Sequence, residues 1–337
     1  MKRVAINGLG RIGGLILRQY AMDPPEGIEI VAANDLIPVG ELAYLLHYDS
    51  VHGRTPFPVS SGEGFIMVGT KKVTITHMKD PKELPWKDLD IDIVLECTGL
   101  FRGREDAQKH RDAGAKKVII SAPTESADLT IVLGVNESQY DPKKHHIISN
   151  ASCTTNSLAP ALKVLNDAFG LDYAMVTTVH AYTSSQALVD KATASLKRTR
   201  GRAAALSLVP TSTGAGKATE LVLPELKGRM DAIAIRAPIP DGAITDIVAS
   251  LGRDVTIDEV NAAFRKAADG PLKGILGYND EQIVSADIIG DTHSGIIDAP
   301  STKVIMGRVV KVFVWYDNEY GYSRRMLDLS GHIAKRM

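Results

Sequence analysis

The chain has 337 residues, of which 44% are hydrophobic and 23% charged, and its formal net charge is −1. This length suits two domains, and the balance is ordinary for a globular enzyme, so neither nucleic acid nor an anionic membrane is indicated as a main partner. Two cysteines, Cys97 and Cys153, exclude a disulfide framework and a cysteine-based zinc site, and no metal site is predicted. Without a signal-peptide pattern or an apolar run near the roughly 20 residues that cross a bilayer, we expect a cytoplasmic protein.

The first predicted element is a strand over residues 4–7, and a helix follows with Ile12, Leu15 and Ile16 on one face. Between them lies a G-x-G-x-x-G pattern, made by Gly8, Gly10 and Gly13. A second strand, over residues 28–35, ends in Asp35, at the distance expected for the acid of a dinucleotide-binding fold. The alternative is a glycine-rich turn in another α/β fold.

These residues predict how a dinucleotide would bind. The glycines let the backbone approach a pyrophosphate, and the helix N-terminus stabilises its negative charge. Asp35 can accept hydrogen bonds from the ribose hydroxyls. It would also repel a 2′-phosphate at ~4 Å by up to about 4 kcal/mol per unit charge at an effective dielectric of about 20. NAD is therefore favoured over NADP.

Residues 40–148 alternate between predicted helices and strands. We expect helices over 41–47 and 106–113, and strands over 65–68, 73–75, 91–99, 117–123, 130–135 and 147–148. The run 91–99 is almost continuously apolar, as in a strand covered on both faces, so Cys97 is interpreted as structural. Two of these strands end in Thr98-Gly99 and Ser121-Ala122, which suits the carboxyl edge of an open sheet, where ligands bind.

Residues 149–157 join a strand to a helix and place Cys153 at or beside the first helical turn. Free N–H groups and the helix dipole favour a thiolate there, but by only one or two pKa units. A nucleophile ionised at pH 7 needs a second cation, usually a histidinium, and His180 follows the next predicted strand. The alternatives are a small buried core cysteine and an ordinary turn histidine.

After this helix the predicted strands become longer, over residues 173–180, 232–237, 243–251 and 304–316. Residues 184–206 have no clear periodicity and carry five basic side chains, which indicates either a functional or interface loop or a solvated basic face. Thr256 and Glu259 form a capping-box pattern before a helix that continues through Val260 and Phe264. The last predicted helix covers residues 318–337.

Five motifs, in order along the chain, resemble the phosphorylating glyceraldehyde-3-phosphate dehydrogenase family from end to end. They lie at residues 6–13, 149–156, 180–183, 213–218 and 315–319. The resemblance implies an α/β protein with a Rossmann NAD-binding domain over 1–151 and 318–337. It also implies an α+β catalytic domain over 152–317 with a mixed, largely antiparallel sheet. A homotetramer is implied as well, in which the 184–206 loop approaches a neighbouring subunit's cofactor.

The resemblance also assigns roles to individual residues. It makes Cys153 the nucleophile and His180 the general base. The implied NAD contacts, besides the glycines, are Arg11, Ile12, Asp35, Thr98, Ser121 and Asn318. The substrate phosphate would meet Thr183 and Arg236, and inorganic phosphate would meet Ser152, Thr154, Thr213 and Gly214. A planar guanidinium on an apolar strand suits phosphate, although an internal salt bridge is the alternative for Arg236.

Three positions depart from the family pattern. Ser185 stands where the family usually has a carboxylate, Ala192 where a bulky residue is common, and Ser157 where a cysteine is usual. The change at Ser185 alters the charge around the substrate phosphate. The loss of bulk at Ala192, which should face the adenosine ribose across a subunit interface, removes one barrier to a 2′-phosphate. We therefore expect NAD preference with some NADP tolerance.

The expected reaction is oxidation of D-glyceraldehyde 3-phosphate to 1,3-bisphosphoglycerate through a Cys153 thioester. Its implied partners are a small phosphorylated aldehyde and inorganic phosphate. The nearest alternative is erythrose-4-phosphate dehydrogenase, which hydrolyses the thioester. The phosphate-site sequence at 211–217 argues against it. A regulatory or RNA-binding protein that binds NAD without turnover is the alternative from another class.

Overall fold

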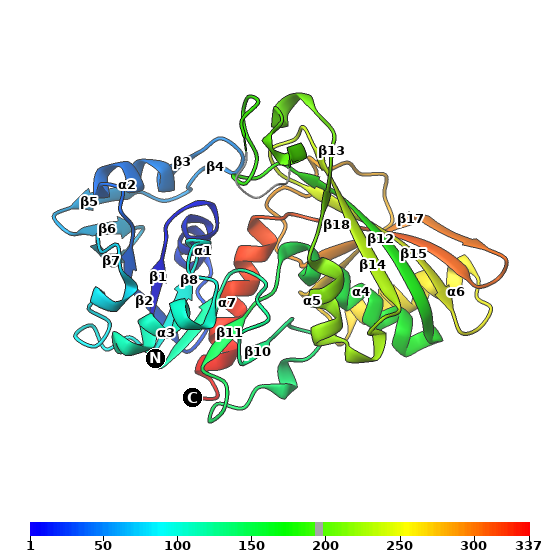
Figure 1. Cartoon of the computed structure of the whole chain (residues 1–337), viewed down its shortest axis with the longest axis horizontal. Helices are drawn as coiled ribbons and strands as arrows, with labels where there is room; N and C mark the ends of the chain where they lie inside the picture. Colours follow the sequence, from blue (N-terminus) through cyan, green and yellow to red (C-terminus); the bar gives the residue numbers. More distant parts are fainter. Residues whose placement is uncertain (193–197) are drawn as a thin grey trace. The chain divides into compact units, whose positions relative to one another are not determined.

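A computed structural model of the chain describes residues 1–192 and 198–337, so Lys197 of the predicted basic loop lies outside the described residues. The chain forms two compact units (Figure 1). Unit 1 comprises Met1–Ile131, Glu137–Ser152 and Tyr322–Met337, and unit 2 comprises Val132–Asn136 and Cys153–Gly321.

Unit 1 is built on a nine-stranded sheet of order β10-β11-β9-β8-β1-β2-β7-β6-β5. The strands from β10 to β7 are parallel, and β6 and β5 add an antiparallel edge. The order β7-β2-β1-β8-β9-β11 is that of a doubly wound dinucleotide-binding fold, which confirms the predicted α/β class. Its strands are β1 (Lys2–Asn7), β2 (Ile28–Asn34), β5 (Val59–Gly62), β6 (Phe65–Val68), β7 (Lys71–Thr76), β8 (Ile93–Glu96), β9 (Lys117–Ile120), β10 (Leu129–Thr130) and β11 (Ile147–Ser149).

The helices of unit 1 connect these strands or follow them. They are α1 (Arg11–Met22), α2 (Val39–His47), α3 (Arg104–Asp112) and the greater part of α7 (Tyr320–Ala334), with short 3-10 helices η1 (Pro81–Glu83) and η2 (Glu137–Gln139). A separate two-stranded ribbon joins β3 (Tyr48–Asp49) to β4 (Gly53–Arg54). All four residues of β8 are buried, as its apolar run predicted.

Two predicted strands end earlier than expected: the run 91–99 forms β8 only over Ile93–Glu96, and the strand predicted over 130–135 stops almost at its start. Residues 130–135 were expected to be extended, but the strand stops at Thr130. The Val132 N–H donates to Asn136 Oδ1 at 2.9 Å, and Gly134 has φ +83°. A side-chain acceptor and a glycine in the left-handed region turn the chain here, although its residues are apolar enough for a strand.

Unit 2 is built on a seven-stranded mixed sheet of order β13-β14-β12-β15-β18-β17-β16. Only the pairs β12–β14 and β16–β17 are parallel, which confirms a largely antiparallel sheet. Helices α4, α5 and α6 pack against it (Figure 1). The bounds are β12 (Leu171–Ala181), β13 (Val209–Ser212), β14 (Met230–Ala237), β15 (Ala243–Leu251), β16 (Leu276–Asn279), β17 (Gly295–Ile305), β18 (Val309–Tyr316), α4 (Cys153–Phe169), α5 (Ala215–Val222), α6 (Ile257–Asp269), η3 (Arg198–Gly201), η4 (Ala204–Leu206) and η5 (Pro224–Leu226).

The prediction of one strand over 304–316 was wrong. The segment contains the end of β17, a turn and all of β18, which pair as an antiparallel hairpin. Met306 and Gly307 form the turn with φ of +51° and +75°. The turn is hard to recognise in the sequence because apolar, β-branched residues continue on both sides of it and one glycine is its only turn signal.

Two other sequence-based expectations were local. The capping box is confirmed, because the Glu259 N–H donates to Thr256 Oγ1 at 3.2 Å and the Thr256 N–H donates to Glu259 Oε2 at 2.8 Å. The described part of the 184–206 segment is more ordered than expected: it contains η3, η4 and a bridge between Ala187 and Ala203. Among the described residues, no helix has both the length and the apolar character needed to cross a bilayer.

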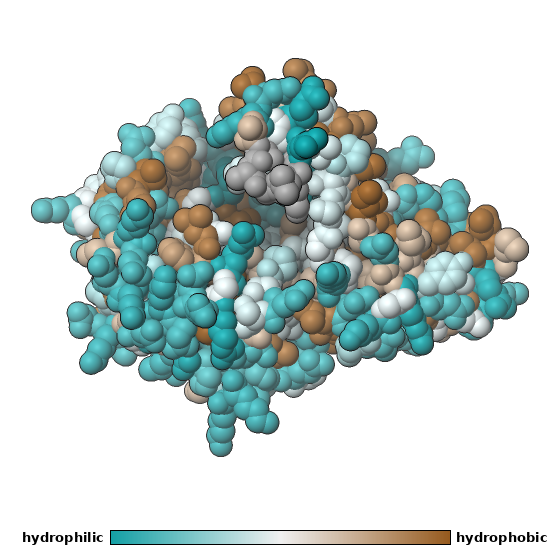
Figure 2. All heavy atoms as spheres, in the orientation of Figure 1, coloured by the Kyte–Doolittle hydropathy of each residue, from teal (hydrophilic) through white to brown (hydrophobic). Residues whose placement is uncertain are grey.

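Unit 2 also leaves hydrophobic side chains on its surface, some of them visible in brown in Figure 2. Along β12, Ala174 and Val176 are buried whereas Tyr173 and Met175 are 53% and 60% exposed. Exposed apolar side chains occur on neighbouring strands too, including Ile233. The helices thus cover one face of the sheet, and the other face keeps an apolar surface.

Candidate active site

The centre of unit 2 brings Cys153 and His180 together. Cys153 is the first residue of α4, and His180 lies near the end of β12. The Cys153 Sγ and His180 Nε2 atoms are 3.4 Å apart, and the imidazole is buried. Parallel pairing of β12 with β14 places Arg236 directly beside His180. The two predicted catalytic residues are therefore in contact, and the predicted phosphate-binding arginine is their neighbour.

Arg236 determines the electrostatics of this pair. Its Nη1 lies 2.6 Å from His180 Nδ1 and donates to the Ala181 carbonyl at 2.8 Å. Burial and then the charge of Arg236 lower the pKa of His180 to about 3. Burial raises the pKa of the Cys153 thiol, and the charge of Arg236 opposes that rise. The structure therefore differs from the expected thiolate–histidinium pair: the cation beside the thiol is a guanidinium, and the imidazole is neutral.

Tyr316 fixes the two catalytic elements to each other. Its hydroxyl lies 2.9 Å from Thr154 Oγ1 on α4 and 2.7 Å from Thr178 Oγ1 on β12. The phenol ring contacts the His180 ring at a right-angled approach, with centroids 5.8 Å apart. Burial is the main reason that the pKa of Tyr316 is raised, so the phenol stays protonated. Sequence reasoning gave this tyrosine no role, although it belongs to the 315–319 motif.

Arg200 is a second guanidinium close to this pair, and sequence reasoning missed it. Its Nε donates to Thr211 Oγ1 at 2.9 Å, and its Nη2 donates to the Ser212 carbonyl at 3.2 Å. Its Nη1 reaches Ser185 Oγ at 3.5 Å, and Ser185 Oγ lies 2.9 Å from Thr183 Oγ1. Its only sequence signal was membership of a basic loop. The predicted phosphate residue Thr183 thus lies in one hydrogen-bonded chain with Arg200.

Neither guanidinium has an acid partner. Within the described part of the chain, no aspartate or glutamate forms an ion pair with Arg200 or Arg236. Burial and the charge of Arg236 lower the pKa of Arg200, as expected for two cations in one site. This excludes the internal salt bridge considered for Arg236, and it leaves a positive site suited to a phosphate.

The other predicted phosphate residues lie at helix starts. Gly214 is the N-cap of α5, and Thr213 Oγ1 accepts from the Ala215 N–H at 3.2 Å. Ser152 directly precedes α4. Thr154 turns its hydroxyl to Tyr316, and its backbone N–H is hydrogen-bonded to the Cys153 thiol. Thr213 and Gly214 immediately follow Ser212, whose carbonyl holds Arg200.

Unit 1 contains a cavity of about 870 Å³ at the carboxyl ends of β1, β2 and β8. Gly8, Gly10, Asp35 and Thr98 of the predicted cofactor site line it. Gly8 has φ +93°, and a Cβ on Gly13 would lie 1.9 Å from the Gly8 carbonyl oxygen, so both positions require glycine. A Cβ on Gly10 would meet no atom within 4 Å, which leaves room for a ligand over the loop. The cavity size and this glycine loop fit a dinucleotide.

Asp35 is held in one orientation. Its two carboxylate oxygens accept from the Leu9 N–H at 2.8 Å and the Ile37 N–H at 3.0 Å. Both donors are backbone N–H groups next to residues that line the cavity, so the carboxylate does not swing away from the ribose position. This strengthens the argument that Asp35 disfavours a 2′-phosphate.

The remaining predicted cofactor residues are placed as follows. Arg11, at the start of α1, pairs with Asp49 at 2.5 Å, and Ile12 beside it is half-buried. Ser121 follows β9 and is half-buried, but it does not line the cavity. Asn318 follows β18 in unit 2, where its Oδ1 is buried without a hydrogen-bond partner among the described residues. Such an orphaned acceptor suits an amide donor of a ligand.

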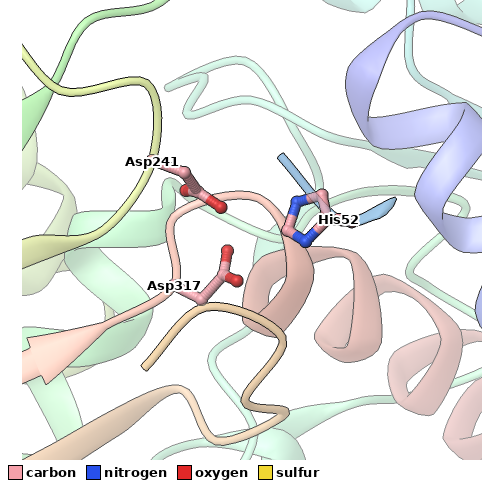
Figure 3. Close-up of side chains that lie close together, drawn as sticks. All are labelled: His52, Asp241 and Asp317. Atoms are coloured by element: carbon pink, nitrogen blue, oxygen red, sulfur yellow. The ribbon is translucent and has the colours of Figure 1, made fainter. Parts of the chain in front are cut away.

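The carboxyl groups of Asp241, just before β15, and Asp317, just before Asn318, lie close together (Figure 3). Asp317 accepts from the N–H groups of Glu319, Tyr320 and Gly290. Burial, followed by the charges of Asp317 and Glu319, raises the pKa of Asp241 to about 9. Asp241 therefore keeps a proton at neutral pH and can share it with Asp317. This shared proton would link the start of β15 to the end of β18.

Unit 1 has the fold and cavity of a dinucleotide-binding domain, and unit 2 has a cysteine–histidine pair beside two uncompensated arginines. A dinucleotide-binding fold and a site with these groups are typical of a dehydrogenase that acts on an anionic substrate. The family description "Glyceraldehyde 3-phosphate dehydrogenase, NAD binding domain" matches residues 2–104, and the corresponding C-terminal domain matches residues 152–318. The chain belongs to the glyceraldehyde-3-phosphate dehydrogenase family, and its N-terminal part is the NAD-binding domain.

Curated relatives agree over the whole length. The chain is 53% identical to the glyceraldehyde-3-phosphate dehydrogenase of Geobacillus stearothermophilus, over 99% of this chain and 98% of that protein. It is 52% identical to glyceraldehyde-3-phosphate dehydrogenase 1 of Bacillus subtilis, with the same coverage. Identity to the enzyme of Mycolicibacterium smegmatis is 52%, over 99% of both chains. Similarity at this level confirms the resemblance found in the motifs.

Proposed function

We propose that this protein catalyses the NAD-dependent oxidation of D-glyceraldehyde 3-phosphate with inorganic phosphate to 1,3-bisphosphoglycerate. Family membership supports the activity. The observation that carries the mechanism is the 3.4 Å contact between Cys153 Sγ and His180 Nε2. Arg236 and Arg200 lie next to this pair, and neither has an acid partner among the described residues. The two cations would hold the phosphate of the substrate and the inorganic phosphate, and the thiol would reach the carbonyl carbon between them.

In the first step, the Cys153 sulfur bonds to the aldehyde carbon while His180 Nε2 takes the thiol proton and returns it to the oxygen. The product is a hemithioacetal. NAD bound by unit 1 supplies the acceptor for the hydride that leaves this carbon. As the hydride leaves, His180 accepts the hydroxyl proton and a thioester remains on Cys153. A phosphate oxygen then attacks the thioester carbonyl, and the C–S bond breaks to give the acyl phosphate and a Cys153 thiolate.

The contact between Arg236 and His180 links substrate binding to proton transfer. A guanidinium only donates, so when its Nη1 faces His180 Nδ1, that nitrogen accepts and Nε2 carries the proton. A phosphate on Arg236 would compete for the same N–H group and reduce its charge. Nδ1–H could then donate to the Ala181 carbonyl, which lies 2.7 Å away, and Nε2 would become the acceptor that faces the thiol. Binding of the phosphorylated substrate would thus turn His180 into a base.

The roles of the remaining predicted residues follow from their positions. Gly8, Gly10, Gly13 and Asp35 would hold the cofactor, with Arg11, Ile12, Thr98, Ser121 and Asn318 as further NAD contacts. Thr183 and Arg236 would bind the substrate phosphate, and Ser152, Thr154, Thr213 and Gly214 would bind inorganic phosphate. Ala192 is exposed, and we propose that its small side chain lets the enzyme use some NADP.

Three further proposals concern organisation. The apolar face of the unit 2 sheet supports assembly into a homotetramer, which sedimentation equilibrium would test. We place the domain boundaries at 1–151 with 318–337, and 152–317. Two cysteines that form no disulfide agree with a reducing cytoplasm, and fractionation of cells would test that location.

The decisive experiment follows NADH formation with several phosphorylated aldehydes, with and without phosphate or arsenate. We expect turnover of glyceraldehyde 3-phosphate that requires phosphate or arsenate, and a preference for NAD over NADP. A Cys153→Ala variant should lose at least about 10³-fold in kcat while it still binds NAD. Turnover of erythrose 4-phosphate without any phosphate requirement would contradict the proposal, as would activity that survives in the Cys153→Ala variant.

A further inference from the structure

A buried carboxylate lies directly behind the cofactor cavity of unit 1. Glu96 ends β8 and is only 1% exposed. Its Oε2 accepts from Asn7 Nδ2 at 2.6 Å and faces His110 Nε2 at 3.0 Å. Its Oε1 accepts from the Thr98 N–H at 2.8 Å and from the Thr98 hydroxyl. Four donors therefore converge on one side chain that does not itself line the cavity.

Trp86 fixes the tautomer of His110 in this cluster. The Trp86 Nε1–H can only donate, and it donates to His110 Nδ1 at 3.0 Å. Nδ1 is therefore an acceptor, His110 is neutral, and its Nε2–H donates to Glu96. Asn7, Thr98 and His110 can therefore all donate to Glu96, which is the acceptor of this cluster. No lysine or arginine in the described ranges pairs with it.

Burying a carboxylate without a full countercharge costs free energy of folding, so a role for it is expected. The residues that contact it indicate what that role is. Asn7, which makes one of these four contacts, and Thr98, which makes two, both line the cavity. The Asn7 Oδ1 accepts from Asn34 Nδ2 at 2.8 Å, which orients a third lining residue. Thr98 packs against the glycine loop so closely that a Cβ on Gly8 would lie 2.9 Å from it. Glu96 thus ties the ends of β1 and β8 to the loop over which the dinucleotide would bind.

We infer that Glu96 is a positioning residue for NAD. It acts through Asn7 and Thr98, and Trp86 and His110 hold its carboxylate in place. The inference rests on the proposed function only in that NAD binds in this cavity. It predicts that Glu96 sets the affinity for the cofactor while the chemistry at Cys153 is left unchanged.

The test compares Glu96→Gln with Glu63→Gln, a matched change at an exposed glutamate of the same unit. A glutamine has one acceptor oxygen and an NH₂ group, so either Thr98 or the Asn7–His110 side must face another donor. The Kd and KM for NAD should rise about tenfold or more in Glu96→Gln, while kcat at saturating NAD stays within about twofold. Glu63→Gln should bind NAD like the wild type.

A double-mutant cycle shows whether Glu96 acts through Thr98. Thr98→Val removes the hydroxyl that donates to Glu96, so the losses in NAD affinity from Glu96→Gln and Thr98→Val should be clearly less than additive in the double variant. If Glu96→Gln does not fold, Glu96→Asp keeps the charge on a shorter side chain and should show an intermediate Kd. Trp86→Phe, which leaves the carboxylate intact but releases His110, should weaken NAD binding by several-fold.

These measurements separate the inference from the proposed reaction. Binding of NAD is measured without aldehyde, by titration and by the shift that NAD causes in Tm. Alkylation of Cys153 by iodoacetamide reports independently that unit 2 is intact. A wild-type Kd in Glu96→Gln, or strictly additive losses in the cycle, would overturn the inference. A wild-type protein that binds NAD but does not oxidise glyceraldehyde 3-phosphate would overturn the proposed function and leave the inference standing.

Discussion

Glu96 of unit 1 is buried and two arginines of unit 2 are half-buried, but their charges are compensated differently. In unit 1, Glu96 receives hydrogen bonds from Asn7, Thr98 and His110, so its charge is satisfied inside the fold. In unit 2, Arg200 and Arg236 lie close to His180 without any acid partner in the described residues. A charge that is hydrogen-bonded within the fold can orient the residues that line a cavity. A charge without an internal partner can bind a ligand of opposite charge. The contrast distinguishes a positioning group from a binding group.

The largest effect on activity should come from removing the uncompensated charge of Arg236. In Arg236→Gln, kcat/KM for the phosphorylated aldehyde should fall about 100-fold, because hydrogen bonds to a charged partner are lost. The charge of Arg236 lowers the pKa of both His180 and Cys153, so both pKa values should rise. The pH profile of Cys153 alkylation should therefore move to higher pH. Arg265→Gln, at an exposed arginine paired with Asp280, is the control. An unmoved profile would contradict the electrostatic role of Arg236.

A smaller effect should follow from compensating the charge inside the site. Ser185→Asp places a carboxylate where the Ser185 hydroxyl now meets Thr183 and Arg200. It would pair with Arg200 and compete with phosphate, so we expect the KM for phosphate or the aldehyde to rise about 3- to 10-fold. Steady-state kinetics measure this, with the exposed Ser61→Asp of unit 1 as a control for net charge. A lower KM for phosphate or the aldehyde in Ser185→Asp would contradict the proposal that the charges of Arg200 and Arg236 bind the phosphate groups.

A change far from both charged clusters should affect stability alone. Thr256→Ala removes one half of the capping box of α6. The free energy of unfolding should fall by about 1 kcal/mol, as measured by chemical denaturation. The KM values for NAD and for the aldehyde should not change. A change in these KM values would show that lower stability alone can alter substrate binding. The effects predicted for Glu96 and Arg236 could then not be assigned to their charges.

The smallest effect on activity is expected for Asp241→Asn, which should change how stability depends on pH. Asp241 keeps its proton to about pH 9 when folded and loses it near pH 4 when unfolded. The folded state therefore binds more protons between these values, and this group makes stability fall as pH rises through that window. An amide imitates the protonated carboxyl of the folded state and does not ionise in the unfolded state, so the variant should match the wild type near pH 4, be more stable than it at pH 7, and lack this pH dependence. Denaturation measured from pH 5 to pH 9 checks it, and identical slopes would refute the shared proton.

Much of the fold could be read from the sequence, because its signals are local. The glycine loop before α1, the acid at Asp35 and the capping box at Thr256 each depend on a few consecutive residues or a fixed spacing. The errors came where apolar patterning continued through a turn. Gly134 and the Met306–Gly307 turn interrupt runs that look like uninterrupted strands. Periodicity reports which side chains are buried, and it does not report where the backbone reverses.

The sequence by itself determined the family, the NAD-binding loop and the candidate pair Cys153 and His180, because these depend on residue types at short spacings. Only the tertiary structure showed that Arg236 and Arg200 lie near that pair without acids, that Tyr316 links Thr154 to Thr178, and that Glu96 collects donors from β1, α3 and its own loop. Those facts join residues far apart in the chain. Charge compensation depends on distance in space and on burial, and the order of residues fixes neither until the chain has folded.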